Sequence, residues 1–423
     1  MPNTTQTPNS TQRKAPPAQP QPKKNLFLEV LGTLLSPDKH TVYRVRGGVD
    51  RIFLIIVVLL VCYGSIMVAS ASYVFANATM GGDSFYFIKK QLLWATIGII
   101  AMIVMSVVDY GFLKKATPAI FAVSYFLLWL VFVPVIGVSN KGATRWVNLY
   151  VVQFQPSDVM KFALVLMMAL YISKFQHKAK TFQYGLLCPA CIVVLVCGTV
   201  ALEKHMSATI ILFIIGASMI FIAGADMKWV GGIAATFAAA ATSLILFTDY
   251  TKKRVDAWLH PENDIGGSNW QPYQSLLAIG SGGLFGVGLG NSYQKHLWLP
   301  EPQNDFIFAI VCEELGMVGA FTLIALFMLL MWRGFVIAIK APDTFSSMLV
   351  IGLTLKVSIQ AILNIAVVTT TIPTTGIALP FFSYGGTALV MQLAEMGIIL
   401  SISRFSSGEK NIFENKQRNY QPI

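Results

Sequence analysis

The sequence predicts an all-α polytopic membrane protein with ten transmembrane helices. Its 423 residues are 55% hydrophobic and only 12% charged, and the mean hydropathy of +0.63 is far above that of a soluble domain. Apolar stretches of about 20 residues, which is the length of a helix that crosses a bilayer, recur along most of the chain.

The ten predicted spans occupy most of the chain and leave one large loop between the seventh and the eighth. They are expected at 52–73, 91–108, 117–137, 157–174, 184–202, 207–224, 229–248, 306–331, 345–369 and 377–402. An even number of spans places both termini on one side of the membrane. Lys and Arg are more frequent in the loops on that side, so both termini are predicted to be cytoplasmic. Lys252, Lys253 and Arg254 depart from this bias.

The sequence outside the spans divides into two tails and a short linking segment. Residues 1–24 are rich in Pro, Gln, Thr and Asn, which predicts a disordered cytoplasmic tail. Residues 25–50 begin with apolar residues at helical spacing and are expected to form a juxtamembrane amphipathic segment. The membrane domain follows at 51–405, and 406–423 form a cytoplasmic C-terminal tail. The long polar lead argues against a cleavable signal peptide.

Charge and cysteine content add little to this assignment. The net charge of +11 is explained by basic cytoplasmic loops, so we predict membrane lipid and no nucleic acid as a partner. The five cysteines, which all lie in apolar stretches, are interpreted as small buried hydrophobes. They are Cys62, Cys188, Cys191, Cys197 and Cys312.

The large loop at 249–305 is predicted to be extracytoplasmic and functional, because polar loops of this length are uncommon in compact domains. It contains several Trp and Tyr residues, which suit the headgroup level of a membrane. Its glycine-rich stretch 280–290 lacks the spacing of a nucleotide-binding loop, and its glycines are expected to allow tight turns or close packing.

Asp305 stands where this loop becomes the apolar run of the eighth span. Asn304 or Asp305 has the pattern of a helix cap. A carboxylate at the mouth of a helix is also well placed to accept a proton from a substrate hydroxyl, and the two roles are compatible. Its pKa depends on burial and on neighbours such as Lys295, which the sequence does not place.

Glu313 and Glu314 lie deeper in the same span. At 1.5 Å and 100° per residue, Glu313 is expected on the Asp305 side of the helix and Glu314 on the other side. Carboxylates at that depth must face the protein and find partners or be protonated. Lys161 and Lys356, the two lysines that fall inside spans, are the expected partners. Structural ion pairing and a direct role are both open.

The segment 140–161 contains the residue types that bind phosphate at a membrane surface. Arg145 is followed by Trp146, and arginine can bind two phosphate oxygens at once. Snorkelling of Arg145 to lipid headgroups is an equal alternative. Asp158 and Lys161 are three residues apart, so they are expected to pair on one helix face.

The stretch 369–398 is interrupted by prolines and glycines at the entry of the tenth span. Pro373, Pro380, Gly385 and Gly386 predict non-helical backbone, which a membrane tolerates only against protein or a polar cavity. Ser383 lies in this interruption and is expected to line such a cavity. A kinked packing helix is the alternative.

These features together favour chemistry or transport on a lipid-linked, phosphate-bearing substrate. At the same motifs, the chain resembles the SEDS family of bacterial shape, elongation, division and sporulation proteins, and most closely its division-type members. The stretches that carry the resemblance are KGATRW, QFQPSD, QSLLAIGSGGLFGVGLG, LPEPQNDFIFAIVCEELG, NIAVVTTTIPTTGIALPFFSYGG and SISR, between about residues 50 and 405.

The resemblance implies a peptidoglycan glycosyltransferase that polymerises lipid II on the outer face of the cytoplasmic membrane, at the division septum. It implies a cognate class B penicillin-binding protein and other divisome proteins as partners. Asp305 aligns with the family's catalytic aspartate, and Arg145 and Lys295 align with its basic residues.

The remaining assignments complete the predicted site. Trp146, Gln274 and Ser383 are predicted to contact substrate, and Lys161, Glu313, Glu314 and Lys356 to support it as intramembrane polar groups. The sequence contains no carboxylate cage for a metal, so no cofactor is assigned, although Mg²⁺ or Mn²⁺ is an open alternative. A lipid II flippase and a non-catalytic scaffold are the alternatives to the enzyme.

Overall fold

The computed structural model describes most of the predicted membrane domain. The described residues are 26–36, 47–133, 137–140, 143–148, 153–203, 205–226, 228, 231–232, 249–260, 265–267 and 269–406. The predicted tail 1–24 lies outside them, as do residues 407–423 of the predicted tail 406–423 and nearly all of the predicted span 229–248.

The chain separates into two compact units, residues 1–38 and residues 39–423. In the first unit, α1 (Leu26–Leu35) is helical, within the segment predicted to be amphipathic. The hydroxyl of Thr33 donates to the carbonyl of Glu29 one turn earlier.

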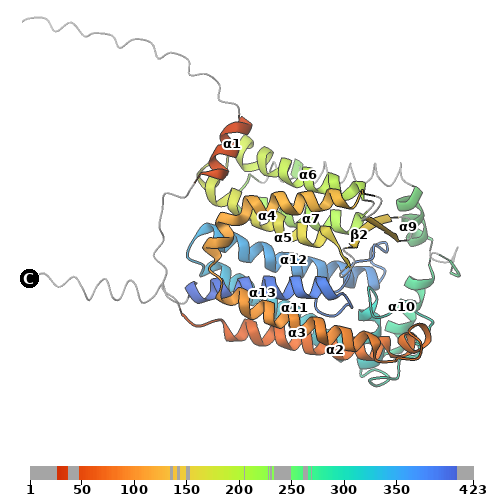
Figure 1. Ribbon diagram of the computed structural model, residues 1–423. Helices are drawn as coiled ribbons and strands as arrows, with labels where there is room; N and C mark the ends of the chain where they lie inside the picture. The colour runs from red at the N-terminus through yellow and green to blue at the C-terminus, as the bar shows by residue number, and fades with distance from the viewer. Residues whose placement is uncertain are drawn as a thin grey trace, which may run out of the picture. The chain divides into compact units, whose positions relative to one another are not determined.

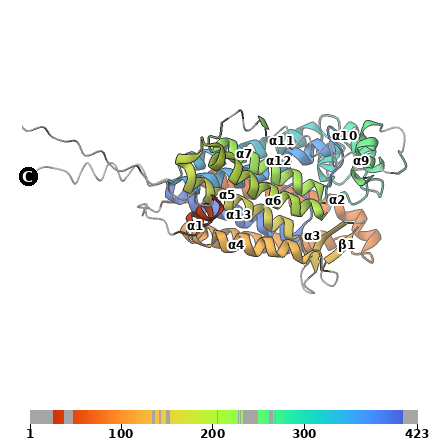
Figure 2. The same ribbon diagram turned by 90° about the horizontal axis from the view of Figure 1, so that it is seen from above.

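The second unit is a bundle of long apolar helices (Figures 1 and 2). Among the described residues, seven helices are long and apolar enough to span a membrane. Each predicted span other than 229–248 overlaps a helix, although the span predicted at 117–137 ends at Leu130, before β1 (Gly137–Asn140). The helices are α2 (Arg51–Thr79), α3 (Tyr86–Val107), α4 (Tyr110–Leu130), α5 (Pro156–Phe175), α6 (Cys188–Leu202), α7 (Met206–Ile222), α11 (Ile307–Ile339), α12 (Thr344–Val368) and α13 (Gly386–Ser406). A 3₁₀ turn, η1 (Gln176–Lys178), and a π-helix, η2 (Phe182–Leu187), connect α5 to α6.

The helices α12 and α13 form the centre of the bundle. Two thirds of the apolar window of each is buried, against 22% for α3 and α4. Helix α12 packs on α11, α5 and α7, and α13 packs along α3. The central position follows from composition, because α12 and α13 carry polar side chains that are costly to expose to lipid.

One end of the bundle carries the non-membrane elements, and we call it the loop end (right in Figures 1 and 2). Three short antiparallel strands lie there, β1 (Gly137–Asn140), β2 (Ala143–Asn148) and β3 (Gln153–Phe154), in the order β1-β2-β3. The all-α prediction is therefore wrong for this segment. The large loop also contains two helices, α9 (Asp249–Leu259) and α10 (Trp270–Ser281).

Helix α11 is broken at Gly316, and the glycine-rich stretch before the helix fills the break. Gly316 adopts φ 64° and ψ −160°, a conformation that only glycine adopts readily. The carbonyls of Glu313 and Glu314, freed at the break, accept the N–H groups of Val287 and Gly288 at 3.0 Å each. A Cβ on Gly316 would come within 2.4 Å of the backbone nitrogen of Gly286. The expectation that these glycines allow close packing is confirmed.

The predicted interruption before the last span is also confirmed. Helix α13 begins at Gly386 rather than at residue 377, because Pro380 lacks an N–H and residues 379–383 form a turn. The N–H of Ser383 donates to the carbonyl of Leu379, and the Ser383 hydroxyl accepts the N–H of Leu379 at 2.7 Å.

The interpretation of all five cysteines as buried holds for only two of them, Cys197 and Cys312. Cys188 is partly exposed, and Cys62 and Cys191 are exposed on the surfaces of α2 and α6. Both exposed thiols lie in apolar helices, where the surrounding solvent is lipid.

Gly316→Ala is expected to destabilise the protein by at least about 2 kcal/mol, because alanine is strained at φ 64° and its Cβ meets backbone. Thermal unfolding of the detergent-solubilised protein measures the change. Gly198→Ala in α6 is the matched control, since a Cβ there meets nothing within 4 Å, and it should leave stability unchanged or slightly raised. Equal melting temperatures for the two variants would contradict the assigned role of Gly316.

Candidate active site

A cavity of about 650 Å³ opens at the loop end of the bundle. Its lining combines segments that are far apart in the sequence, from α3, β2, the start of α5, the loop before α11, α12 and residues 376–392. Six of the predicted site residues line it, and they are Arg145, Trp146, Lys161, Asp305, Lys356 and Ser383. Four of the predicted site residues do not, and they are Gln274, Lys295, Glu313 and Glu314.

Asp305 lies at the wall of this cavity, immediately before α11. The predicted cap at Asn304 or Asp305 is wrong, because Phe306 takes the N-cap position and the helix begins at Ile307. Asp305 is partly exposed and lines the cavity. A Cβ on Gly376 would lie 3.2 Å from Oδ2 of Asp305, so the carboxylate lies close to the backbone of Gly376.

The loop that contains Asp305 is joined to the irregular segment 377–385 by three hydrogen-bonding groups. The Ser383 hydroxyl donates to the carbonyl of Asn304 at 2.7 Å, and the N–H of Tyr384 donates to the carbonyl of Gln303 at 2.9 Å. The side-chain amide of Asn364 donates to the carbonyl of Asp305 at 2.7 Å. Ser383 therefore shapes the cavity through backbone contacts.

The cavity contains four basic side chains, Lys90, Arg145, Lys161 and Lys356. The predicted pair of Lys161 with Asp158 is confirmed, with Nζ 2.7 Å from Oδ1. Lys356 pairs with Glu395 of α13, a partner that the sequence did not suggest. Both lysines are almost fully buried, so each depends on its acid partner for stability.

Glu313 and Glu314 do not pair with Lys161 and Lys356, and that prediction is wrong. Lys295 pairs with Glu314, with Nζ 2.9 Å from Oε1. Glu313 accepts the N–H of Tyr293 at 2.8 Å and the hydroxyl of Ser292. Both carboxylates are fully buried and face the same loop, rather than opposite sides of α11. Ser70 of α2 also donates to Glu314, at 2.6 Å.

Lys295 pairs with Glu314 and does not line the cavity that contains Asp305, and its contact with substrate stays a prediction. It is 4% exposed and its ammonium also donates to the carbonyl of Gly290. Gln274 is likewise buried, on α10. The next residue, Ser275, joins α10 to α12 by donating to the carbonyl of Val368 at 2.7 Å.

The hairpin between α6 and α7 adds two buried titratable groups, His205 in the lining of the cavity and Glu203 nearby in the sequence. Burial, together with the charges of Lys161 and Arg145, lowers the pKa of His205 to about 3, so the ring is neutral at pH 7. Burial raises the pKa of Glu203 to about 8, against the opposing effect of Arg145. Neither Glu203 oxygen has a hydrogen-bond partner among the described residues.

Two polar residues on α12 escaped the sequence analysis. Gln360 lines the cavity and donates to the carbonyl of Ala378 at 2.9 Å, and Asn364 holds the Asp305 loop. With Lys356 they lie at positions i, i+4 and i+8, which share one helix face. A polar residue every fourth position in an otherwise apolar span was the signal that could have identified them.

The described part of the chain contains no cluster of side chains that could bind a metal ion. No group of three or more His, Cys, Asp and Glu side chains is arranged there to hold an ion. Three acids line the cavity: Asp158 pairs with Lys161, Glu301 accepts the side-chain amide of Asn304, and Asp305 lies beside Gly376.

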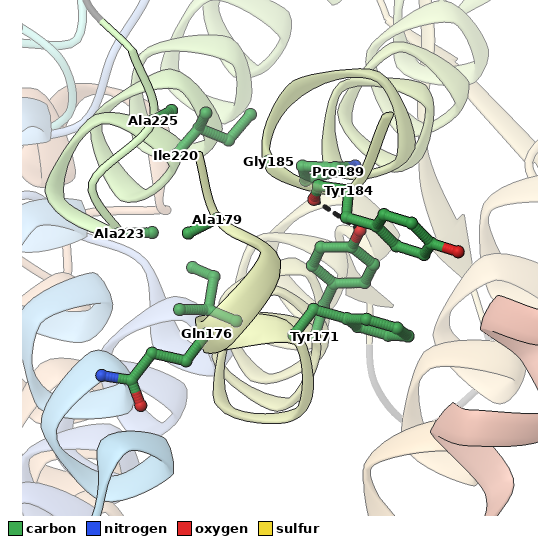
Figure 3. Close-up of a pocket in the computed structure, with 11 residues that line it drawn as sticks. Tyr171, Gln176, Ala179, Tyr184, Gly185, Pro189, Ile220, Ala223 and Ala225 are labelled. Carbon is green, nitrogen blue, oxygen red and sulfur yellow. Dashed lines mark hydrogen bonds between the residues drawn. The ribbon is translucent and has the colours of Figure 1, made fainter. Parts of the chain in front are cut away.

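A second pocket at the junction of α5, η2 and α7 is too small to be a reaction site. Its volume is about 10 Å³, enough for a single water molecule. Figure 3 shows Tyr171 beneath Tyr184, with the Tyr171 hydroxyl donating to the Tyr184 carbonyl at 2.6 Å. The other labelled side chains around it are mainly apolar, so it is a packing defect beside the π-helix.

The sequence of this bundle matches a known protein family. The family model described as "Cell cycle protein", for FtsW, RodA and SpoVE, matches residues 50–408. The chain belongs to the FtsW/RodA/SpoVE family. The sequence motifs predicted this family. The matched residues include the helix bundle, the cavity lining and Asp305.

Individual relatives of this family cover most of the chain. "Stage V sporulation protein E" of Bacillus subtilis (strain 168) is 40% identical over 357 residues, 84% of this chain and 97% of that protein. "Probable peptidoglycan glycosyltransferase FtsW" of Geobacter sp. (strain M18) has the same identity and coverage.

Solved structures show the same fold. The crystal structure of the rod shape determining protein RodA of Thermus thermophilus has a TM-score of 0.63 at 24% identity, over 84% of this chain and 97% of that one. A chain from a structure entitled "Structural coordination of polymerization and crosslinking by a peptidoglycan synthase complex" has a TM-score of 0.69 at 24% identity, over 85% and 98%. The FtsW/RodA/SpoVE fold is thus a polytopic membrane fold shared by this chain.

Lys295→Met is expected to destabilise the protein by about 3–5 kcal/mol, because it leaves Glu314 buried without its counter-charge. Combining it with Glu314→Gln should restore part of the loss. Chemical or thermal unfolding in detergent measures both. The matched control is Lys89→Met, which removes an exposed pair with Asp83 and should change stability little. If Lys295→Met were as stable as Lys89→Met, the result would contradict a stabilising ion pair between Lys295 and Glu314.

Glu203→Gln is expected to flatten the pH dependence of stability between pH 5 and 8. The folded pKa of about 8 lies above the ordinary value of 4.5, so the folded protein keeps a proton that the unfolded chain releases. Stability from this group is therefore complete below pH 4.5 and is lost as pH rises to 8, by about 1.4 kcal/mol per pH unit. Melting temperatures at pH 5 and pH 8 measure it. Identical shifts in wild type and variant would show that Glu203 ionises normally.

Proposed function

We propose that this chain is a peptidoglycan glycosyltransferase that polymerises lipid II. The observation that carries the proposal is the Asp305 carboxylate on the wall of a polar cavity with four basic side chains, at one end of a membrane bundle. Support comes from several relatives at 38–40% identity that are named peptidoglycan glycosyltransferases. The outer face of the cytoplasmic membrane is the proposed location of the loop end, with both termini in the cytoplasm.

Asp305 is assigned the role of general base. It would accept the proton from the carbon-4 hydroxyl of the GlcNAc unit of an incoming lipid II, and the oxygen would attack the anomeric carbon of the lipid-linked MurNAc. The bond to pyrophosphate breaks as the new glycosidic bond forms, on the opposite face, so an α-linkage becomes β. One proton acceptor is sufficient for such an inverting reaction.

Basic residues of the cavity are assigned to the leaving group. Arg145 from β2 would bind two oxygens of the pyrophosphate at once, and Lys90 adds a further positive charge in the same cavity. Such pre-placed cations stabilise charge that develops as the bond breaks. Trp146, beside Arg145, is placed to contact a sugar ring or the lipid headgroup region.

No step of this mechanism is assigned to a metal. The described residues offer no cluster of ligands for one. If Mg²⁺ or Mn²⁺ takes part, we expect it to arrive bound to the pyrophosphate and to share the charge with Arg145.

A class B penicillin-binding protein is the proposed partner, and the division septum is the proposed site of action, with other divisome proteins. The related fold in a peptidoglycan synthase complex that couples polymerisation to crosslinking supports a crosslinking partner. The relatives named FtsW favour division, and the relative named for stage V sporulation makes sporulation the competing role.

Asp305→Asn is expected to lower the rate of glycan polymerisation by about 10²–10⁴, which is the usual contribution of a general base. Glycan chains formed from labelled lipid II are measured with purified protein and a transpeptidase-dead partner, at equal folded amounts. Asp83→Asn is the matched control, because Asp83 is an exposed acid at a turn between α2 and α3, and it should retain the wild-type rate.

The outcomes separate the candidate functions. Polymer from wild type and Asp83→Asn alone supports the polymerase and its base. No polymer from any form would overturn the proposal and favour a flippase or a scaffold. Equal polymer from all three forms would show that Asp305 is not the base.

A further inference from the structure

We propose that Asn364 is a positioning residue for Asp305, and that its side-chain amide sets the place of the Asp305 carboxylate in the cavity wall. The inference deepens the proposed function, because it assumes that Asp305 is the base. Asn364 lies on α12, is fully buried and does not line the cavity, so it acts from behind the wall and not on substrate.

The single NH₂ group of Asn364 joins two segments. It donates to the carbonyl of Asp305 at 2.7 Å and to the carbonyl of Ile377 at 2.6 Å. Both of its hydrogens are therefore used, one on each side. Neither carbonyl belongs to a regular helix, so these bonds satisfy buried acceptors that secondary structure leaves open.

The orientation of the amide is fixed by its neighbours. If the oxygen and nitrogen of Asn364 exchanged places, the oxygen would face two carbonyl oxygens at hydrogen-bond distance, which is repulsive. Oδ1 itself has no hydrogen-bond partner among the described residues. A buried polar atom without a partner costs free energy, and the two donated bonds are the compensation that keeps asparagine here.

The two bonds fix a distance that matters for the chemistry. Ile377 follows Gly376, whose Cβ position lies 3.2 Å from Oδ2 of Asp305. Holding the carbonyls of Asp305 and Ile377 on one amide therefore fixes the carboxylate against that backbone. Gln360, one turn away on α12, holds the next carbonyl, of Ala378, at 2.9 Å. Without Asn364 the loop and the segment can separate, and a shift of about 1 Å in a reacting group can cost about 100-fold in rate.

The test compares three substitutions in the full-length chain with its partner. Asn364→Leu keeps a similar volume and removes both donors, and Asn364→Asp keeps the shape but places oxygen against two carbonyls. Both substitutions of Asn364 are expected to lower kcat by about 10- to 100-fold with KM for lipid II unchanged. Asn364→Asp is expected to have the larger effect. Ser358→Ala is the control, since this buried hydroxyl of α12 bonds only locally, to Thr354, and it should keep the wild-type kcat.

A double-mutant cycle separates positioning from a general loss of structure. If Asn364 acts through Asp305, then Asn364→Leu in the Asp305→Asn background should change the residual rate by less than about twofold. A full additional loss in that background would overturn the proposal. So would a rise in KM with kcat unchanged, or a wild-type kcat in Asn364→Leu.

Hydrogen–deuterium exchange gives a readout that does not depend on activity. In Asn364→Leu, peptides that contain residues 301–308 and 374–383 should exchange faster than in wild type, while α2 and α6 are unchanged. Absence of polymer from wild type would refute the polymerase and not the contact, which the exchange data test alone. Unchanged exchange in both peptides would overturn the positioning role whatever the kinetics.

Discussion

The arrangement of the site depends on one constraint, which is that the buried irregular backbone at 377–385 must have every polar group satisfied. Side chains supply the partners that a helix would have provided. The side-chain amides of Gln360 and Asn364 on α12 donate to the carbonyls of Ala378 and Ile377. Gln392 of α13 accepts the N–H of Phe381 at 3.1 Å. The polar faces of α12 and α13, and hence their central place in the bundle, follow from that need.

A second constraint, the cost of burying a charged side chain without a partner, explains the charge distribution in the cavity. Lys161 and Lys356 are buried beside Asp158 and Glu395, so the inner part of the cavity has paired charges. Arg145 comes from the strand β2 at the loop end, where a charged substrate would arrive. A polar cavity of this kind is stable in a membrane bundle because each deep cation has an acid partner.

Hydropathy and local spacing predicted much of the fold. The positions of the spans follow from apolar length, the Asp158–Lys161 pair follows from an i, i+3 spacing, and the break before α13 follows from Pro380 and Gly386. These features are local, so the sequence around each residue is enough to determine them. The position of Asp305 directly before α11 was also predicted, while its catalytic role stays a prediction.

The features that escaped prediction arise from contacts between distant segments. Lys295 pairs with Glu314 because the glycine-rich stretch folds back onto the break at Gly316. The same stretch continues into residues 292–295, which contact both Glu313 and Glu314. Asn364 escaped prediction for a different reason, since its i+8 spacing from Lys356 is a weak signal in a helix that also contains several Ser and Thr residues.

The central claim is that Asp305 takes a proton during glycan polymerisation. The most direct test is the pH dependence of kcat for polymerisation by the purified complex, measured for wild type and for the residual activity of Asp305→Asn. The wild-type rate should fall tenfold per pH unit on the acid side, as the base becomes protonated, and the variant should lack that limb. The same acid limb in both proteins would mean that another group is the base, and that Asp305 serves a different purpose.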